Sequence, residues 1–165
     1  MDPLNLIRTL CYTVENQTRF VCQDLTDDDE RWRPKDTNSP AIGWTVGHII
    51  ATHDLMINHR ICENSILFPE LYDHFGFATN GNFPEHFTLE DLFDKFKQLN
   101  SEIVQTILSK DPSWLDETFD TDGFPPNWQG KNRGKGFALA INHGITHTGQ
   151  ILEIKRMLGK GAWGF

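Results

Sequence analysis

Hydrophobic residues recur at intervals of three and four positions in four stretches of the chain. This spacing gives one apolar face to an α-helix, which has about 3.6 residues per turn. It predicts helices over residues 3–23, 39–64, 88–111 and 136–159. The strict alternation of polar and apolar residues that marks β-strands is scarce. The pattern therefore predicts an all-α fold.

Residues that favour helix ends flank three of these stretches. Ser39 followed by Pro40 suits the start of the second helix, because serine caps a helix and proline fits its first turn. Thr88, with Asp91 three positions later, is a variant of the capping box at the start of the third. Gly159 suits the end of the fourth. The buried face expected for the fourth helix comprises Phe137, Ala140, Ile141, Ile145, Ile151, Ile154 and Leu158.

Two of the connections between these helices are long. Residues 65–87 and 110–134 are rich in Phe, Pro, Gly, Asn and Asp, and loops of this length in a compact domain are usually functional. Their aromatic residues favour packing against the helices rather than disorder. We therefore expect residues 1–165 to form a single domain, a four-helix bundle with at least one long crossover. Long crossovers also permit neighbouring helices to run parallel.

Composition narrows the possible partners. The formal net charge of −8 and the lack of a basic cluster exclude a nucleic-acid-binding role, which needs a cationic face. The densest basic group is Lys131, Arg133 and Lys135, expected in a solvated loop. No apolar stretch has the length of a membrane span, and the first residues do not resemble a signal peptide. Three cysteines without a CxxC pair indicate free thiols in a reducing compartment, so a cytoplasmic location is expected.

The last predicted helix contains His143 and His147, four positions apart. Four residues advance a helix by about 6 Å and return the side chain to within roughly 40° of the same direction. Both imidazoles therefore lie on one face, where they could bind a single metal ion, and Gln150 returns to that face. Imidazole is a common ligand of zinc and also suits nickel, copper and iron. Two histidines at this spacing also occur by chance, so a third ligand is needed to support a site.

His48 is the candidate for that third ligand. It lies in an apolar part of the second predicted helix, between Gly47 and Ile49, where a buried ring nitrogen needs a partner. Gly43 and Gly47 would allow another helix to approach closely. With His143 and His147, it would give a site with three protein ligands and an open fourth position, which is typical of catalytic metal sites. The alternative is a core histidine with an ordinary hydrogen bond. The remaining histidines are weaker candidates: His53 and His59 because of their helical positions, and His74 and His86 because they lie in predicted loops.

A metal ion held by three neutral imidazoles would acidify a bound water or a bound thiol, so hydrolysis and thiol transfer both stay open. Gln150 is a candidate for a contact to a ligand or substrate, or for a helix hydrogen bond only. Trp44 and Trp128 are candidates for the pocket wall, although Trp44 also suits the core. Asp54 is not expected to act as a general base, because it lies six positions after His48 and faces elsewhere. No GxSxG motif or P-loop occurs.

Taken in order, these features resemble the DinB/YfiT-like superfamily of metalloenzymes. The resemblance rests on Trp44 and the step Gly47-His48, on the threonine-capped third helix, and on His143-x-x-x-His147-x-Gly149-Gln150. It implies a four-helix bundle of up-down-down-up order, with zinc, nickel or a similar divalent ion bound by His48, His143 and His147. It also implies a homodimer, and some relatives use a low-molecular-weight thiol as a co-substrate.

Two hypotheses of different classes follow. The first is a metal-dependent enzyme acting on a small molecule, as a thiol (S-)transferase or a hydrolase. The second is a non-enzymatic bundle in which the ion is structural and ties the second helix to the fourth. An open fourth coordination position favours the first hypothesis, whereas a fourth protein ligand favours the second.

Overall fold

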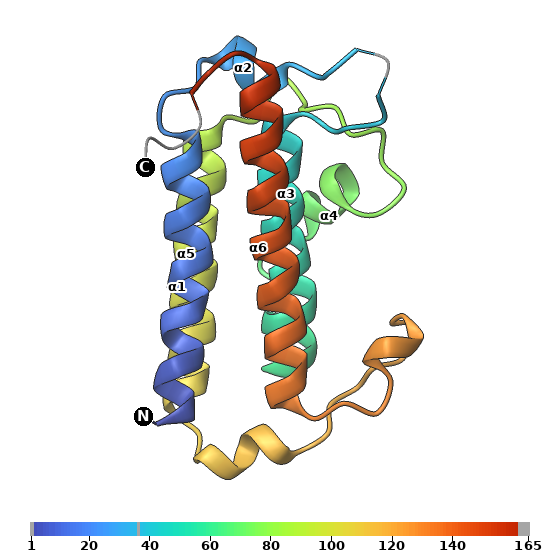
Figure 1. Ribbon diagram of the computed structural model, residues 1–165. Helices are drawn as coiled ribbons and strands as arrows, with labels where there is room; N and C mark the ends of the chain where they lie inside the picture. Colours follow the sequence, from blue (N-terminus) through green and yellow to red (C-terminus); the bar gives the residue numbers. More distant parts are fainter. Residues whose placement is uncertain (1, 36, 162–165) are drawn as a thin grey trace.

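The computed structural model describes residues 2–35 and 37–161, and helices dominate it (Figure 1). The four long ones are α1 (Pro3–Cys22), α3 (Ile42–His53) with its continuation η1 (Asp54–Ile61), α5 (Leu89–Leu108) and α6 (Arg133–Met157). Short helical segments lie between them: α2 (Asp27–Arg31), α4 (Pro69–Phe75), η2 (Pro112–Asp116) and η3 (Pro126–Trp128). The described residues contain no named strand, only an isolated bridge between Thr118 and Asn132. The prediction of an all-α fold is confirmed.

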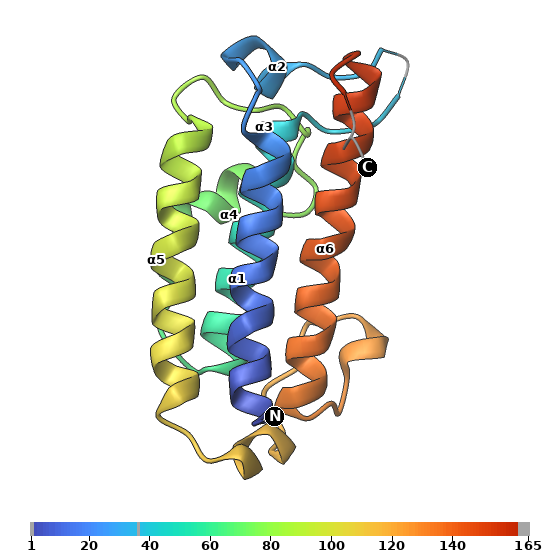
Figure 2. The ribbon, with the colours of Figure 1, turned by 60° about the vertical axis from the view of Figure 1, so that its left-hand side comes forward.

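The long helices lie side by side in two directions (Figures 1 and 2). α1 and α6 run from the bottom of Figure 1 to the top, and α3 and α5 run from the top to the bottom. α1 packs against α5 and α6, and α3 packs against α4, α5 and α6. The antiparallel contact between α3 and α6 places the middle of each helix beside the other. This contact builds the candidate site.

The core forms where the apolar faces of the long helices meet. The α1 side chains spaced three and four residues apart are buried, and Cys11 and Val14 among them have no exposed surface. The same holds for the α5 face, which includes Phe96 and Ile103. Complete burial of such side chains contributes roughly 1.5–3 kcal/mol each. The three cysteines are free and buried, as the sequence indicates.

Two predicted helix starts are wrong. α3 begins at Ile42 with Ala41 at its cap, not at Ser39-Pro40, and no side chain caps it. The segment before it is tied to other loops instead, because Ser39 accepts a hydrogen bond from Arg33. α6 begins at Arg133 rather than near Gly136, because the side chain of Asn132 caps it.

Arg133 also corrects the expectation of a solvated basic loop. Its side chain is buried, donates to the carbonyl oxygen of Ile61 and pairs with Glu63 at 2.7 Å. A buried guanidinium needs such partners, because desolvating an unpaired charge is costly. Arg133 therefore ties the start of α6 to the end of η1.

The buried face of α6 differs from the expected one at Ile145, which is 42% exposed. Gly144 and Thr148 lie on the buried face, where small side chains let α6 approach its neighbours. Thr148 makes a 2.8 Å hydrogen bond with Thr18 of α1, which satisfies its buried hydroxyl group. The hydrophobic character of Ile145 therefore predicts the wrong face of α6 for this residue.

The long connections are more structured than predicted. The 65–87 connection contains α4, so the half-buried His74 lies on a helix rather than in a loop. A Cβ atom on Gly47 would lie 2.6 Å from the ring of Phe75, and one on Gly43 would lie 2.2 Å from the ring of Phe83. The close approach predicted from the two glycines therefore occurs, with α4 at one glycine and a loop phenylalanine at the other.

None of the helices in the described part of the chain combines the length and the apolar character that crossing a membrane requires.

Candidate metal centre

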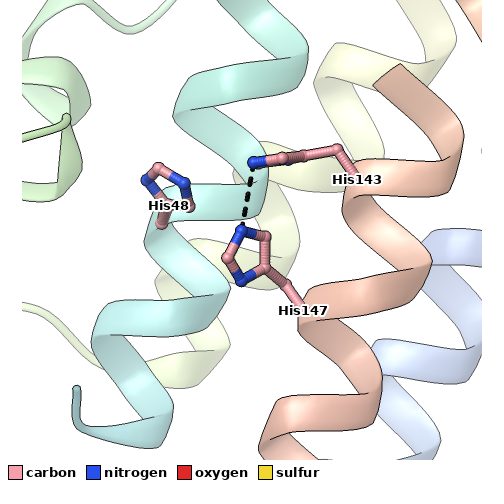
Figure 3. Close-up of side chains that lie close together, drawn as sticks. All are labelled: His48, His143 and His147. Carbon is pink, nitrogen blue, oxygen red and sulfur yellow. Dashed lines mark hydrogen bonds between the residues drawn. The ribbon is translucent and has the colours of Figure 1, made fainter. Parts of the chain in front are cut away.

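Three histidines from two helices meet at the centre of the α3–α6 contact (Figure 3). His48 projects from α3, and His143 and His147 project from successive turns of α6. Each offers one ring nitrogen, and these atoms all lie within 4.8 Å of one another. The Nε2 atoms of His143 and His147 are 3.1 Å apart. The structure thus brings together the three side chains that the sequence analysis singled out.

The hydrogen bonds of two of these rings determine which nitrogen faces the others. The Nδ1 atom of His48 lies 2.7 Å from the carbonyl oxygen of Phe75. Because a carbonyl oxygen only accepts, Nδ1 carries the proton and Nε2 keeps its lone pair. Nδ1 of His147 lies 2.7 Å from Oε1 of Gln150 in the same manner. Gln150 therefore makes the ring contact expected of a residue that orients a ligand.

Burial keeps the three imidazoles neutral. Burial, and to a smaller extent the neighbouring His147, His48 and His53, lower the pKa of His143 to about 3. Burial also lowers the pKa of His48 and of His147, and their hydrogen bonds to Phe75 and Gln150 offset part of the effect. Neutral rings have the lone pairs that a metal ion requires, so the group is ready to bind a cation near pH 7.

The arrangement fits a divalent ion. With Zn–N bonds of about 2.0–2.1 Å and tetrahedral angles, two ligand nitrogens lie about 3.3 Å apart. The 3.1 Å between His143 and His147 is close to this value, and the wider separations need only small ring movements. Within residues 2–35 and 37–161, no carboxylate or thiol joins this histidine group. Three protein ligands leave a coordination position open.

A cavity of about 840 Å³ lies beside His143. Trp128 lines this cavity, in agreement with its candidate role in a pocket wall. Trp44 does not line it but stacks on the His48 ring, with centroids 4.9 Å apart and planes at 9°. The indole N–H of Trp44 donates to Thr79, which holds the stacked ring in place. The two tryptophans therefore act on different sides of the site.

His53 is a neighbour of the site, although its position five residues after His48 predicts a different face of the helix. It has no exposed surface, and its Nε2 lies 3.3 Å from the carbonyl oxygen of Ala140 on α6. Gly144, between the two α6 histidines, packs over it: a Cβ there would lie 2.8 Å from Nε2 of His53. A glycine between two candidate ligands was the available signal of this close contact.

Asp54 does not join the histidine group, in line with the expectation that it faces elsewhere, and it is buried. Its carboxylate accepts the backbone N–H groups of Leu67 and Phe68 at 2.9 and 2.8 Å. It also accepts the side-chain amide of Asn58. Asp54 therefore anchors the start of the 65–87 connection where α3 changes into the π-helical η1.

Comparison with known families agrees with the geometry. No protein with a curated description matches this chain. The sequence profile of the DinB superfamily matches residues 11–151, a range that contains His48, His143, His147 and Gln150. That match covers most of the chain, and the superfamily includes metal-binding members. The chain belongs to the DinB superfamily.

Proposed function

We propose that this chain is a metal-dependent enzyme that acts on a small molecule, as a thiol (S-)transferase or a hydrolase. In this proposal, Nε2 atoms of His48, His143 and His147 bind one divalent ion, zinc or nickel. The observation that carries it is the convergence of three neutral rings beside a cavity, without a fourth protein ligand among the described residues. Such an ion lowers the pKa of a water or thiol that reaches its open position.

The surrounding residues hold the rings for this task. The carbonyl oxygen of Phe75 and the amide oxygen of Gln150 each accept an Nδ1 proton, which orients a ring and increases the basicity of its Nε2. Trp44 limits rotation of His48 by stacking on it. A thiol co-substrate is supported by the resemblance to thiol-using relatives. Hydrolysis is supported by the same open position, which water can also occupy.

The test of the metal site is elemental analysis of purified protein. Wild type should carry one divalent ion per chain, and His147→Ala should lose it. His86→Ala is the matched control, because His86 is exposed and lies outside the histidine group. Equal metal content in wild type and His147→Ala would refute the assignment. Two activity assays on the metal-loaded protein then separate the two reactions. A thiol together with an electrophile tests thiol transfer, and an ester tests hydrolysis.

The alternative function, a structural ion, makes a different prediction. α3 and η1 are already tied to α6 by the His53–Ala140 hydrogen bond and by Arg133, which contacts Ile61 and Glu63. We therefore expect the protein to stay folded after treatment with a chelator, as judged by far-UV circular dichroism. Loss of the helical signal on metal removal would favour the structural role.

A homodimer and a cytoplasmic location are further parts of this proposal, and they rest on the family resemblance and on the free cysteines. Light scattering of the purified protein tests the first.

A further inference from the structure

The cavity beside His143 has walls from three parts of the chain. One wall is η1 with the end of α3, the second is α4 with its flanking residues, and the third is the 122–128 segment. Its volume of about 840 Å³ lies within the range of small-molecule sites, about 300–1,000 Å³. Its apolar lining includes Met56, Phe68, Tyr72, Phe77, Phe124 and Trp128.

Several of these apolar side chains are exposed to solvent. Phe77 is 70% exposed, Tyr72 46% and Ile66 39%. All three line the cavity, and Phe77 also meets the His48 ring edge-on, with centroids 5.2 Å apart. A group of exposed apolar residues around a hollow is typical of a binding site. Through Phe77, the exposed apolar residues around the cavity therefore reach the histidine group.

The charges at the cavity disfavour an anionic ligand. Among the described residues that line it, the one cationic side chain is Arg60, which is paired with Asp120 and lies over the Phe124 ring. Asp73 and Asp122 also line the cavity, and both are exposed, so their carboxylates add negative potential at the mouth. Away from the histidine group, a ligand with a free carboxylate or phosphate would meet this negative potential, and the nearby Arg60 is already paired.

The lining of the cavity includes residues along the helix from Ala51 to Arg60 and, from α6, His143. α3 and α6 are antiparallel (Figure 1), and His53 contacts Ala140, so His143 lies near Ile50 and Ala51, at the α3 end of this lining. Arg60 follows Ala51 by nine residues, which at the α-helical rise of about 1.5 Å per residue corresponds to at most about 14 Å. A phenyl ring on a four-carbon chain has a comparable length.

We propose that this cavity is the substrate pocket of the histidine centre and that it binds an uncharged aryl or alkyl body. The reacting group of the substrate then lies at His143, and the apolar body extends along η1 toward Arg60. This inference rests on the proposed function for the position of the reacting group. The choice of an uncharged apolar body rests on the lining of the cavity alone.

The experiment measures the affinity of three thiols for the cobalt-substituted protein by visible absorption. The thiols are 2-mercaptoethanol, 4-phenylbutane-1-thiol and a derivative of 4-phenylbutane-1-thiol that carries a carboxylate on its ring. The phenyl compound should bind at least about tenfold more tightly than 2-mercaptoethanol, because its ring leaves water. The ring carboxylate should remove most of this gain. Equal affinities of 2-mercaptoethanol and the phenyl compound, or tightest binding of the carboxylate, would overturn the inference.

Substitutions in the cavity walls test where the phenyl ring binds. Tyr72→Ser, from the α4 wall, and Phe124→Ser, from the 122–128 wall, should each reduce the advantage of the phenyl compound by several fold. Leu108→Ser is the control, because Leu108 is 51% exposed and lies outside the cavity lining. Urea unfolding of each variant verifies that the fold is intact. An advantage that is unchanged in both wall variants would place the ring elsewhere and overturn the inference.

A final measurement separates this inference from the proposed function. We expect 4-phenylbutan-1-ol, which has no thiol, to bind the metal-free protein saturably in calorimetry and to bind more weakly to Phe124→Ser. If no thiol binds at cobalt but the alcohol binds in this manner, the proposed function fails and the apolar pocket stands. If thiols bind at cobalt but the alcohol does not bind, the pocket inference fails and the metal site stands.

Discussion

Gly144 and Gly149 lie on the same helix, and we predict different effects on stability when each is replaced by alanine. A Cβ on Gly144 would lie 2.8 Å from Nε2 of His53 and 2.8 Å from a methyl carbon of Val14. Ordinary contacts between such atoms are about 3.5–4.0 Å, so α6 or its neighbours must shift by roughly 1 Å. A Cβ on Gly149 would meet nothing within 4 Å.

The neighbours of Gly144 have little freedom to move. Neither His53 nor Val14 has exposed surface, and His53 is hydrogen-bonded to Ala140. Overpacking in such a place costs about 1–3 kcal/mol. Alanine also gains about 1 kcal/mol over glycine inside a helix, at both positions. Gly149→Ala should therefore be more stable than wild type by about 0.5–1 kcal/mol, and Gly144→Ala less stable than Gly149→Ala by about 1–3 kcal/mol.

The assay is urea unfolding of the metal-free proteins, followed by far-UV circular dichroism. The helix-propensity gain cancels in the comparison of the two variants, so their difference reports the packing at His53. Metal affinity, measured by titration with a chelator as competitor, should fall in Gly144→Ala only, because this residue lies between two candidate ligands. Equal stability of the two variants would refute the close packing of α6 on His53.

Three more predictions follow from single contacts. Gln150→Ala should weaken metal binding about 10–100-fold, because His147 loses the partner of its Nδ1, and competition with a chelator measures this. Burial lowers the pKa of His53 from 6.5 to about 4, so the unfolded chain binds more protons below pH 6.5. The contribution of neutral His53 to stability is therefore complete above pH 6.5 and falls by about 3 kcal/mol as the pH decreases toward 4, as measured by urea unfolding. Asp54→Asn should cost about 1–3 kcal/mol, because an amide satisfies fewer of the N–H groups of Leu67 and Phe68, and hydrogen exchange at these amides should increase.

Each of these has an outcome that would contradict it. If Gln150→Ala bound the metal as tightly as wild type does, Gln150 would have no role in metal binding. A pH dependence of stability that is the same in His53→Gln and wild type would show that His53 does not titrate as described. Unchanged exchange at Leu67 and Phe68 in Asp54→Asn would mean that the carboxylate does not anchor that segment.

Local sequence signals were reliable where the cause of the structure is local. The three-and-four spacing located the long helices, because burial of one helical face decides that pattern. Thr88 caps α5 as predicted, since its hydroxyl group accepts the N–H of Asp91 within the same turn. The signals failed where a distant contact intervened. Ile145 faces solvent because Gly144 and Thr148 fill the packed face of α6, where Thr148 bonds to Thr18 of α1. The start of α6 at Arg133, by contrast, has a local cause, since Asn132 caps the helix through the N–H of Lys135.

The candidate site divides in the same way. The proximity of His143 and His147 follows from their spacing on one helix, which is why the sequence alone determined it. The arrival of His48 depends on α3 lying antiparallel to α6 in one register, and that register is maintained by contacts such as His53 with Ala140. The carbonyl oxygen of Phe75 comes from a crossover segment, and the cavity needs η1, α4 and residues 122–128 together. These are contacts between residues far apart in the chain, and only tertiary packing selects among the many pairings that a helical pattern allows.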